Sequence, residues 1–252
     1  MGGSMKKKIY INPGHSDKDP GAVGFETERD LNVRTAGFME AWLLENYACE
    51  VKVTPGSNNS PRATAQEAND WGADLFVSIH FNAGGGDGYE ALVGDDRQVP
   101  LGKLFEKYVQ QAGQNSRGVK LRPELAVLRY THMPAVLNEG AFVDNRQDIA
   151  DWNEDAELKR LAIAYGMAAA EFLQLEKKNT VTLTLPVLSY GSKGEAVKAV
   201  QDLLKGAGYK VGTTGKFGAG TQSVLEKAQL AWQIPVTGKT DGETWKALLG
   251  IK

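Results

Sequence analysis

Three dispersed residues have the chemistry of a catalytic zinc site. The chain contains only three histidines, and two of them, His15 and His80, follow short apolar runs that are typical of strands. Side chains just past the carboxyl ends of strands gather in one crevice of an open α/β sheet, so these two imidazoles can share an ion. Glu28 completes a His₂Glu set, one of the ligand sets of catalytic zinc that leave a fourth position for water. A second carboxylate, Glu139, is a candidate general base.

Each of these residues also has an ordinary structural explanation. Glu28 can stabilise the N-terminus of a helix through the helix dipole. His15 can be a turn residue, and His80 can be a satisfied polar residue at the end of a strand. The nearby Glu26 is a second acidic residue, but the Arg-Asp-Leu-Asn sequence that follows Glu28 does not follow it.

Three further polar residues are weaker candidates. His132 precedes Met-Pro and is either a residue of the cleft or, as we favour, a histidine of a surface loop. Asn82 can orient His80 from outside the ligand set. Arg129 can contact a substrate carboxylate, and a surface ion pair is an equally good explanation.

The composition limits the classes of protein to which the chain can belong. Its 252 residues suffice for one large domain or two smaller ones, and the net charge of -2 argues against a nucleic-acid binder. The chain contains no run of 18 or more apolar residues, so the sequence predicts no membrane span. Cys49 is the only cysteine, which excludes an internal disulfide and a cysteine-rich metal site. Residues 6–8 resemble the start of a signal peptide, but the apolar stretch breaks at residues 12–14, so we expect no export by that segment.

The charge is divided unevenly along the chain. Residues 188–252 hold nine lysines against five acidic residues, a balance of +4, whereas the rest holds 20 basic and 26 acidic residues, a balance of -6. A basic module on an acidic body favours a polyanionic target for the module. A solvated lysine face is the alternative explanation.

The first part of the chain alternates strand and helix patterns. Expected helices begin at Thr27, capped in a box with Asp30, and at Pro61, a residue tolerated in the first helical turn. Expected strands cover residues 9–11, 50–54, 75–79, 89–93, 125–128 and 135–137, and further helices cover residues 101–112 and 158–173. Strands separated by helices of this length predict an α/β fold with a mostly parallel, helix-flanked sheet.

A polar, threonine-rich stretch divides the chain. We predict a catalytic domain over residues 5–175, a linker over 176–187 and a small all-α domain of three helices over 188–252. Two glycine-rich turns that echo each other separate these three helices. Trp232 and Trp245 can stack on sugars, but at helical spacing they are more often core residues.

The segments around the candidate site resemble a known family. These are Asn12-Pro-Gly-His15 with Asp19-Pro-Gly-Ala22 and Glu28-Arg-Asp-Leu-Asn32, then Ser78-Ile-His-Phe-Asn-Ala83, and finally Met133-Pro-Ala-Val-Leu137 with Glu139-Gly-Ala-Phe142. In this order they resemble the motifs of the zinc-dependent N-acetylmuramoyl-L-alanine amidases, and the resemblance covers residues 8 to about 173.

The resemblance implies a role for each candidate residue. His15, Glu28 and His80 would bind Zn²⁺, and Glu139 would act as catalytic base. Zinc lowers the pKa of bound water to near 7, and a base that takes the water proton can pass it to the departing amine. The bond cut, by resemblance, joins the lactyl group of N-acetylmuramic acid to L-alanine in peptidoglycan.

The C-terminal part resembles a second family. The sequence from Leu188 through Gly194, the turn Gly215-Lys-Phe-Gly218 and the pair Thr244-Trp245 are similar to peptidoglycan-binding domains of the three-helix type. Such a module would tether the catalytic domain to an insoluble polymer and raise its local substrate concentration. Peptidoglycan is thus the expected substrate and anchor, with no nucleic-acid or membrane partner.

These observations lead to one main hypothesis and two alternatives. We expect a monomeric, bacteriolytic enzyme of the phage endolysin type, without a recognisable signal peptide and held in the host cytoplasm until release onto the cell wall. The alternatives are a zinc endopeptidase that cuts the stem peptide of peptidoglycan and a non-catalytic protein that anchors to the wall.

Overall fold

A computed structural model describes residues 6–54, 60–178 and 184–251. The chain forms two compact units, Met1–Thr180 and Val181–Lys252. Among the described residues, none of the helices combines the length and the apolar character needed to cross a membrane. The predicted linker, residues 176–187, contains residues 179–183, which lie outside the described part of the chain.

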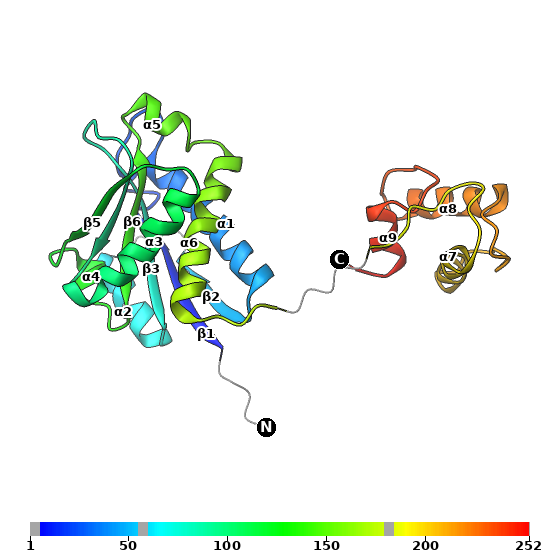
Figure 1. Ribbon diagram of the computed structural model, residues 1–252, viewed down its shortest axis with the longest axis horizontal. Coiled ribbons are helices and arrows are strands. Elements are labelled where there is room, and N and C mark those ends of the chain that lie inside the picture. The colour runs from blue at the N-terminus through cyan, green and yellow to red at the C-terminus, as the bar shows by residue number, and fades with distance from the viewer. Residues whose placement is uncertain (1–5, 55–59, 179–183, 252) are drawn as a thin grey trace, which may run out of the picture. The chain divides into compact units, whose positions relative to one another are not determined.

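The first unit is built on a six-stranded sheet with the order β2-β1-β3-β6-β4-β5 (Figure 1). The strands are β1 (Lys7–Pro13), β2 (Cys49–Val53), β3 (Leu75–Asn82), β4 (Tyr89–Val93), β5 (Ser116–Leu121) and β6 (Ala135–Phe142). All neighbours are parallel except β4 and β6, so the predicted mostly parallel sheet is confirmed. The connection between β3 and β4, residues 83–88, is too short for the long crossover that parallel strands need, so β4 runs in the direction opposite to β3. Because β6 is parallel to β3, β6 and β4 are antiparallel.

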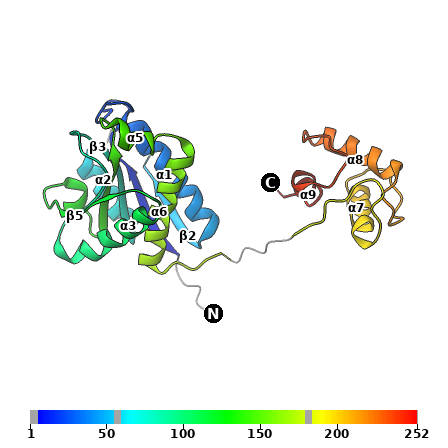
Figure 2. The same ribbon diagram turned by 45° about the horizontal axis from the view of Figure 1, so that its top comes forward.

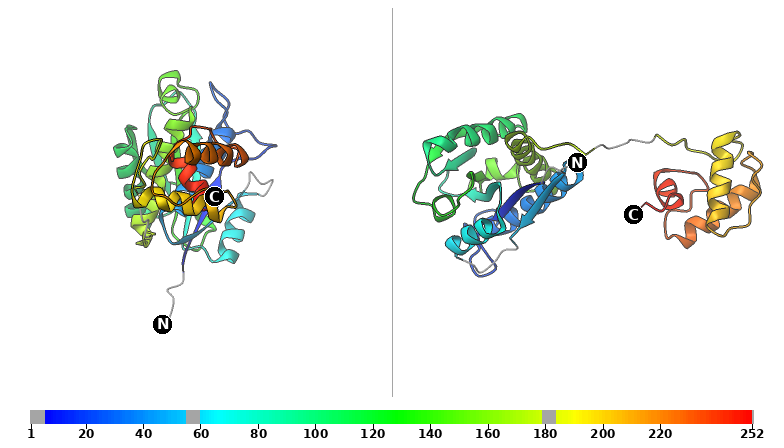
Figure 3. Two further views of the ribbon diagram at one scale, coloured as in Figure 1. Left: turned by 90° about the vertical axis from the view of Figure 1, so that its right-hand side faces the viewer. Right: turned by 90° about the horizontal axis from the view of Figure 1, so that it is seen from below.

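Helices cover both faces of the sheet (Figures 1 and 3). On one face, α1 (Glu28–Asn46), α3 (Val99–Gln111) and α6 (Asp155–Leu173) pack on alternate strand residues such as Ile9, Val77 and Val136. On the other face, α2 (Pro61–Trp71) and the short α4 (Ala126–Arg129) pack on the residues between them. A 3₁₀ turn, η1 (Asp96–Gln98), and α5 (Arg146–Ala150) lie in the connections. Burial on both faces explains why the central strands read as continuous apolar runs.

The structure corrects several local predictions. Residues 125–128, predicted as a strand, lie largely in α4, and β5 was not predicted at all. A short apolar run after a proline does not distinguish a strand from a buried turn of helix. Thr27 is the N-cap residue of α1, but its side chain makes no capping hydrogen bond, so the predicted capping box is wrong. Pro61 does begin α2, and the hydroxyl of Ser60 accepts a hydrogen bond from Ala63 N at 3.3 Å.

The second unit contains α7 (Glu195–Gly206), α8 (Ala219–Ala231) and α9 (Gly242–Leu248), shown in yellow to red in Figure 2. Val197, Leu225 and Trp245 belong to its core. Trp245 is 7% exposed and donates its indole N–H to Pro186 O at 2.9 Å, so this ring is a core residue.

Two buried glutamines hold the glycine-rich turns of this unit in the same way. The Gln201 amide donates to Lys216 O at 3.0 Å, and its oxygen accepts from Gly215 N at 2.9 Å. The Gln229 amide donates to Lys239 O at 3.0 Å, and its oxygen accepts from Gly238 N at 3.0 Å. The two turns, which are similar in sequence, are therefore also held by the same pattern of hydrogen bonds.

Candidate metal and catalytic site

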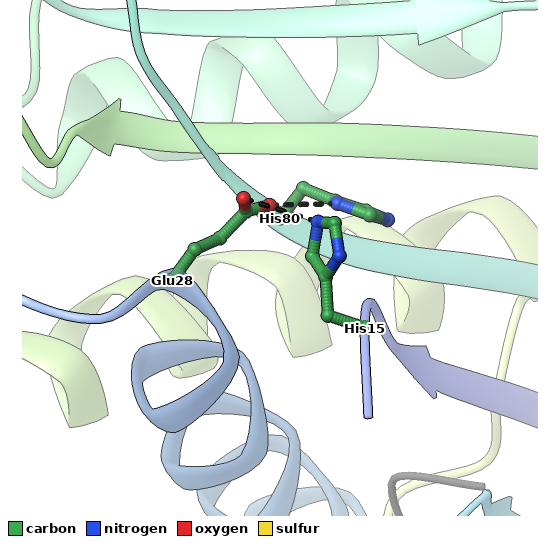
Figure 4. A group of neighbouring side chains, drawn as sticks. All are labelled: His15, Glu28 and His80. Carbon is green, nitrogen blue, oxygen red and sulfur yellow. Dashed lines mark hydrogen bonds and ion pairs between the residues drawn. The ribbon is translucent and has the colours of Figure 1, made fainter. Parts of the chain in front are cut away.

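Three of the predicted site residues converge at the carboxyl-terminal end of the sheet (Figure 4). His15 follows β1, Glu28 is the first residue of α1, and His80 lies near the end of β3. One donor atom from each residue lies within 4.8 Å of the other two. The topology explains this convergence, because β1 and β3 are parallel neighbours and α1 begins beside their carboxyl ends.

The Glu28 carboxylate lies between the two imidazoles. Its Oε2 is 3.1 Å from His15 Nε2, and its Oε1 is 2.9 Å from His80 Nδ1. Backbone N–H groups hold the same oxygens, since Ala22 N donates to Oε2 at 2.9 Å and Phe81 N donates to Oε1 at 3.3 Å. Glu28 is only 5% exposed, so its orientation is fixed by the fold.

The opposite edge of the His15 ring is held by Asp19. The distance from His15 Nδ1 to Asp19 Oδ2 is 3.0 Å, which directs Nε2 toward Glu28. Carboxylates commonly fix metal-binding histidines in this way. His15 also has a φ of 67°, a left-handed conformation that is uncommon for a residue with a side chain and that occurs at functional sites.

Two glycines leave room for the imidazoles. A Cβ at Gly14 would lie 2.1 Å from His80 Cε1, inside the ring's own space. A Cβ at Gly21 would lie 2.5 Å from Glu28 Oε2 and 2.6 Å from His15 Cδ2, and Gly21 has a φ of +69°. Both positions therefore require glycine for the cluster to form.

The electrostatics of the cluster favour an ionised carboxylate. Burial raises the pKa of Glu28, but the hydrogen bonds from His15 and His80 outweigh it and bring this pKa well below its ordinary value. The hydrogen bond to Glu28 raises the pKa of His15 to about 9. The bond with the Glu28 carboxylate thus favours the protonated form of His15 in the metal-free protein, and a cation that binds at His15 must displace that proton.

Glu139 lies on β6 directly beside His80. The two residues are register partners on parallel strands, so their side chains leave the sheet on the same face. Glu139 Oε2 is buried and has no hydrogen-bond partner among the described residues. Burial raises the pKa of Glu139 to about 7, and the charges of Glu28 and Glu90 add to this effect while His80 opposes it. A carboxylate with this pKa is suited to proton transfer near neutral pH.

A cleft of about 580 Å³ opens in front of the two histidines. Its walls come from the His15 loop, from the start of α2 at Ser60 and Pro61, and from α4 at Ala126 and Val127. Residues 125–127, which belong to the segment predicted as a strand, thus form part of the wall of the cleft.

The weaker candidates differ in their outcome. The side-chain oxygen of Asn82 accepts from Ala83 N at 2.8 Å, and no contact with His80 is found among the described residues, so an orienting role is not supported. His132 is exposed, as favoured from the sequence, and lines a different cleft together with Arg129. Asp19 holds the His15 ring, a role that was not predicted although Asp19 lies four residues after His15 and begins the Asp19-Pro-Gly-Ala22 segment of the first motif.

Comparison with known proteins gives the chain its family. The sequence profile described as N-acetylmuramoyl-L-alanine amidase matches residues 9–171, which include all four candidate residues. The chain belongs to the N-acetylmuramoyl-L-alanine amidase family. The profile described as a putative peptidoglycan binding domain matches residues 193–248, within the second unit of this amidase.

Individual relatives of the amidase include bacterial and phage proteins. The N-acetylmuramoyl-L-alanine amidase CwlM of Bacillus licheniformis is 32% identical over 198 residues, 75% of this chain and 78% of that protein. The endolysin of Bacillus phage SPP1 is 34% identical over 190 residues, 69% of each chain. The catalytic domain of CwlV, an amidase of Bacillus (Paenibacillus) polymyxa var. colistinus, superposes with a TM-score of 0.64 at 28% identity, covering 68% of this chain and 99% of that one.

Proposed function

We propose that this amidase hydrolyses the amide bond between N-acetylmuramic acid and L-alanine in peptidoglycan, that it depends on zinc, and that it lyses bacterial cell walls. The observation that carries the proposal is the convergence of His15, Glu28 and His80 beside Glu139. The first three would hold the ion, and the fourth would move the proton.

The residues present fit a zinc ion. Two imidazoles and one carboxylate are a known catalytic ligand set, and their donor atoms already lie within 4.8 Å of one another. The bonds from Asp19 to His15 and from backbone N–H groups to Glu28 are the supporting contacts that such sites need. A bound zinc ion would supply Lewis acidity, which acidifies water and polarises the scissile carbonyl.

Glu139 would carry the proton that the reaction must move. Its carboxylate accepts a proton from the attacking water and returns it to the nitrogen of the departing L-alanine. An amine anion is a poor leaving group, so this second transfer is required for the C–N bond to break. The raised pKa of Glu139, about 7, lets the same group accept and release a proton near neutral pH.

We further propose that residues 188–252 bind the cell wall and that the enzyme works as a monomer of the endolysin type. The match of residues 193–248 to a putative peptidoglycan binding domain and the relationship to a phage endolysin support this role. The surplus of lysine in this module suits a negatively charged wall. Expression in the cytoplasm of a susceptible host should leave cells intact until the membrane is permeabilised.

Digestion of purified peptidoglycan tests the proposal. The protein, with and without a chelator, is incubated with insoluble wall, and the fragments are identified by mass. We expect free stem peptides that begin with L-alanine and intact glycan strands, with activity lost on chelation and restored by Zn²⁺. A peptide stub left on muramic acid would identify an endopeptidase instead, and wall binding without cleavage would identify a non-catalytic anchor.

A further inference from the structure

A second buried carboxylate, Glu90, lies on the other side of Glu139. Glu90 is on β4, and its register partner on β6 is Glu139. Register partners project from the same face of a sheet, so His80, Glu139 and Glu90 form a row across β3, β6 and β4. Glu90 is 6% exposed and lies in a strand whose five residues are all buried. Such a charge needs partners that the apolar strand does not provide.

Two cations on the edge strand β5 supply those partners. Lys120 Nζ lies 2.5 Å from Glu90 Oε1, and the Nε of Arg117 donates to the same oxygen. The side chains of Arg117 and Lys120 are 41% and 42% exposed, whereas that of Glu90 is 8% exposed. Arg117 also lies over the Phe142 ring, 5.2 Å from its centroid. The buried carboxylate thus holds two solvent-facing cations in place.

A bulge in β5 brings both cations to this face. Tyr89 pairs with Ser116 and Ala91 pairs with Val119, so Arg117 and Gly118 together oppose the single residue Glu90. Arg117 and Lys120 are three residues apart, and on a regular strand their side chains would point to opposite faces of the sheet. The extra residue in the bulge shifts the alternation by one, so both side chains point to the face that carries Glu90. Gly118 has a φ of +93°, which suits the bulge to glycine. Bulges that redirect side chains are frequent beside active sites.

Arg117, Lys120 and Glu90 together have a net charge of +1. Two cations share one carboxylate, so the Arg117–Lys120 pair can accept a further anion from solvent without giving up Glu90. The pair lies two strands away from Glu139, a separation of about 10 Å at the spacing of strands in a sheet. One residue of extended peptide spans about 3.5 Å, and arginine and lysine side chains extend several ångströms further. A peptide that is held with its first amide at Glu139 and runs across the strands toward β5 would therefore bring its second residue within reach of the pair.

We propose that Arg117 and Lys120 form a subsite for a free carboxylate on the peptide of the substrate, at the residue that follows L-alanine. The inference rests on the amidase function proposed above. The enzyme would then prefer a stem whose second residue carries a free α-carboxylate, as in D-glutamate, over one in which that group is an amide, as in D-isoglutamine. Arg117 contributes a planar donor group and Lys120 a point charge, a combination suited to a carboxylate.

The test compares two soluble substrates that differ in this group alone. N-acetylmuramoyl-L-Ala-D-Glu-L-Lys and its D-isoGln counterpart are hydrolysed by the zinc-loaded full chain, and kcat and KM are measured for each. We expect the wild-type protein to favour the carboxylate by a factor on the order of ten in kcat/KM, mostly through KM. Arg117→Gln, Lys120→Gln and the double variant should bring the ratio between the two substrates toward one.

A matched control separates this effect from a general loss of surface charge. Arg34 on α1 is 36% exposed and also donates its Nε to a carboxylate, Asp155, so Arg34→Gln should leave the ratio unchanged. Equal cleavage of both substrates by the wild-type protein, or an unchanged ratio in the double variant, would overturn the subsite and leave the amidase function standing. Failure of the wild-type protein to cleave either substrate would refute the amidase proposal and the subsite with it.

Discussion

His80 and Glu139 are held side by side by the backbone hydrogen bonds of two neighbouring strands. They are register partners of β3 and β6, in the middle of the sheet, and no direct bond between their side chains is found among the described residues. The spacing between a candidate metal ligand and the candidate base is therefore set by sheet pairing. A substitution at Glu139 can change the chemistry without displacing His80.

The first prediction concerns Glu139 as the base. Glu139→Gln should lower kcat by a factor on the order of 10² to 10⁴, since proton transfer by a positioned group contributes about that much. Zinc content, measured by mass spectrometry of the metal, should stay at the wild-type level because the His–Glu–His cluster is intact. Glu26→Gln, two residues before Glu28, is the control and should retain activity. A Glu139→Gln variant that still lyses walls normally would remove the assignment.

The same substitution should stabilise the metal-free protein at alkaline pH. Burial raises the pKa of Glu139 from 4.5 to about 7, so the folded state resists an ionisation that the unfolded state permits. The resulting loss of stability is absent below pH 4.5, grows between pH 4.5 and 7, and is complete above pH 7. Glu139→Gln should therefore raise the free energy of unfolding at pH 8, by at most about 3 kcal/mol, and have little effect at pH 4. Urea denaturation in the presence of a chelator measures both values.

Asp19 should affect metal affinity without being a ligand. Asp19→Asn weakens the contact that orients the His15 ring, and such supporting carboxylates typically contribute 10- to 100-fold in affinity. Competition with a zinc chelator of known affinity measures the change. Asp17→Asn is the matched control, because Asp17 lies on the same loop but pairs with Arg29. Equal affinities for the two variants would show that His15 is oriented by other contacts.

Gly14 tests the steric requirement of the cluster. In Gly14→Ala the new methyl group would lie 2.1 Å from His80 Cε1, so the imidazole must move and both metal binding and activity should be lost. Gly37→Ala on α1 meets nothing within 4 Å and should stabilise the protein by up to about 1 kcal/mol, as expected for alanine in a helix. Titration calorimetry with Zn²⁺ and thermal unfolding distinguish the two variants. Normal zinc binding by Gly14→Ala would mean that the loop relaxes around the methyl group.

The sequence predicted the central part of the sheet because its signals are local. The apolar runs that end at Ile11 and Ile79 are buried on both faces, and they place His15 and His80 at one edge whatever the rest of the fold does. Glu28 was predicted as the third ligand from its place near the start of the first long helix as well as from its motif, and it is the first residue of α1, which begins beside this edge.

Residues outside the central strands were harder to predict. Residues 126–129 form a helix in which Val127 and Leu128 pack against α2 and the sheet. These packing partners are distant in the sequence, so the four residues alone do not predict the helix. The strand β5 carries few apolar residues, since it is an edge strand with a glycine bulge. The role of Glu90 depends on that strand, although a glutamate among Tyr89, Ala91 and Leu92 was itself a signal that a charged partner must lie nearby.

The order of the strands has a consequence for engineering. The groups assigned to bond cleavage lie on β3 and β6, each of which has two neighbours, whereas Arg117 and Lys120 lie on β5, which borders only β4. The side chains of Arg117 and Lys120 are 41% and 42% exposed, so they can be exchanged with less disturbance than the buried residues in the interior of the sheet. Libraries confined to positions 117 and 120 are thus a route to altered wall preference with the groups on β3 and β6 unchanged, whereas Gln114 is left out because its buried amide donates to Gly140 O, beside Glu139.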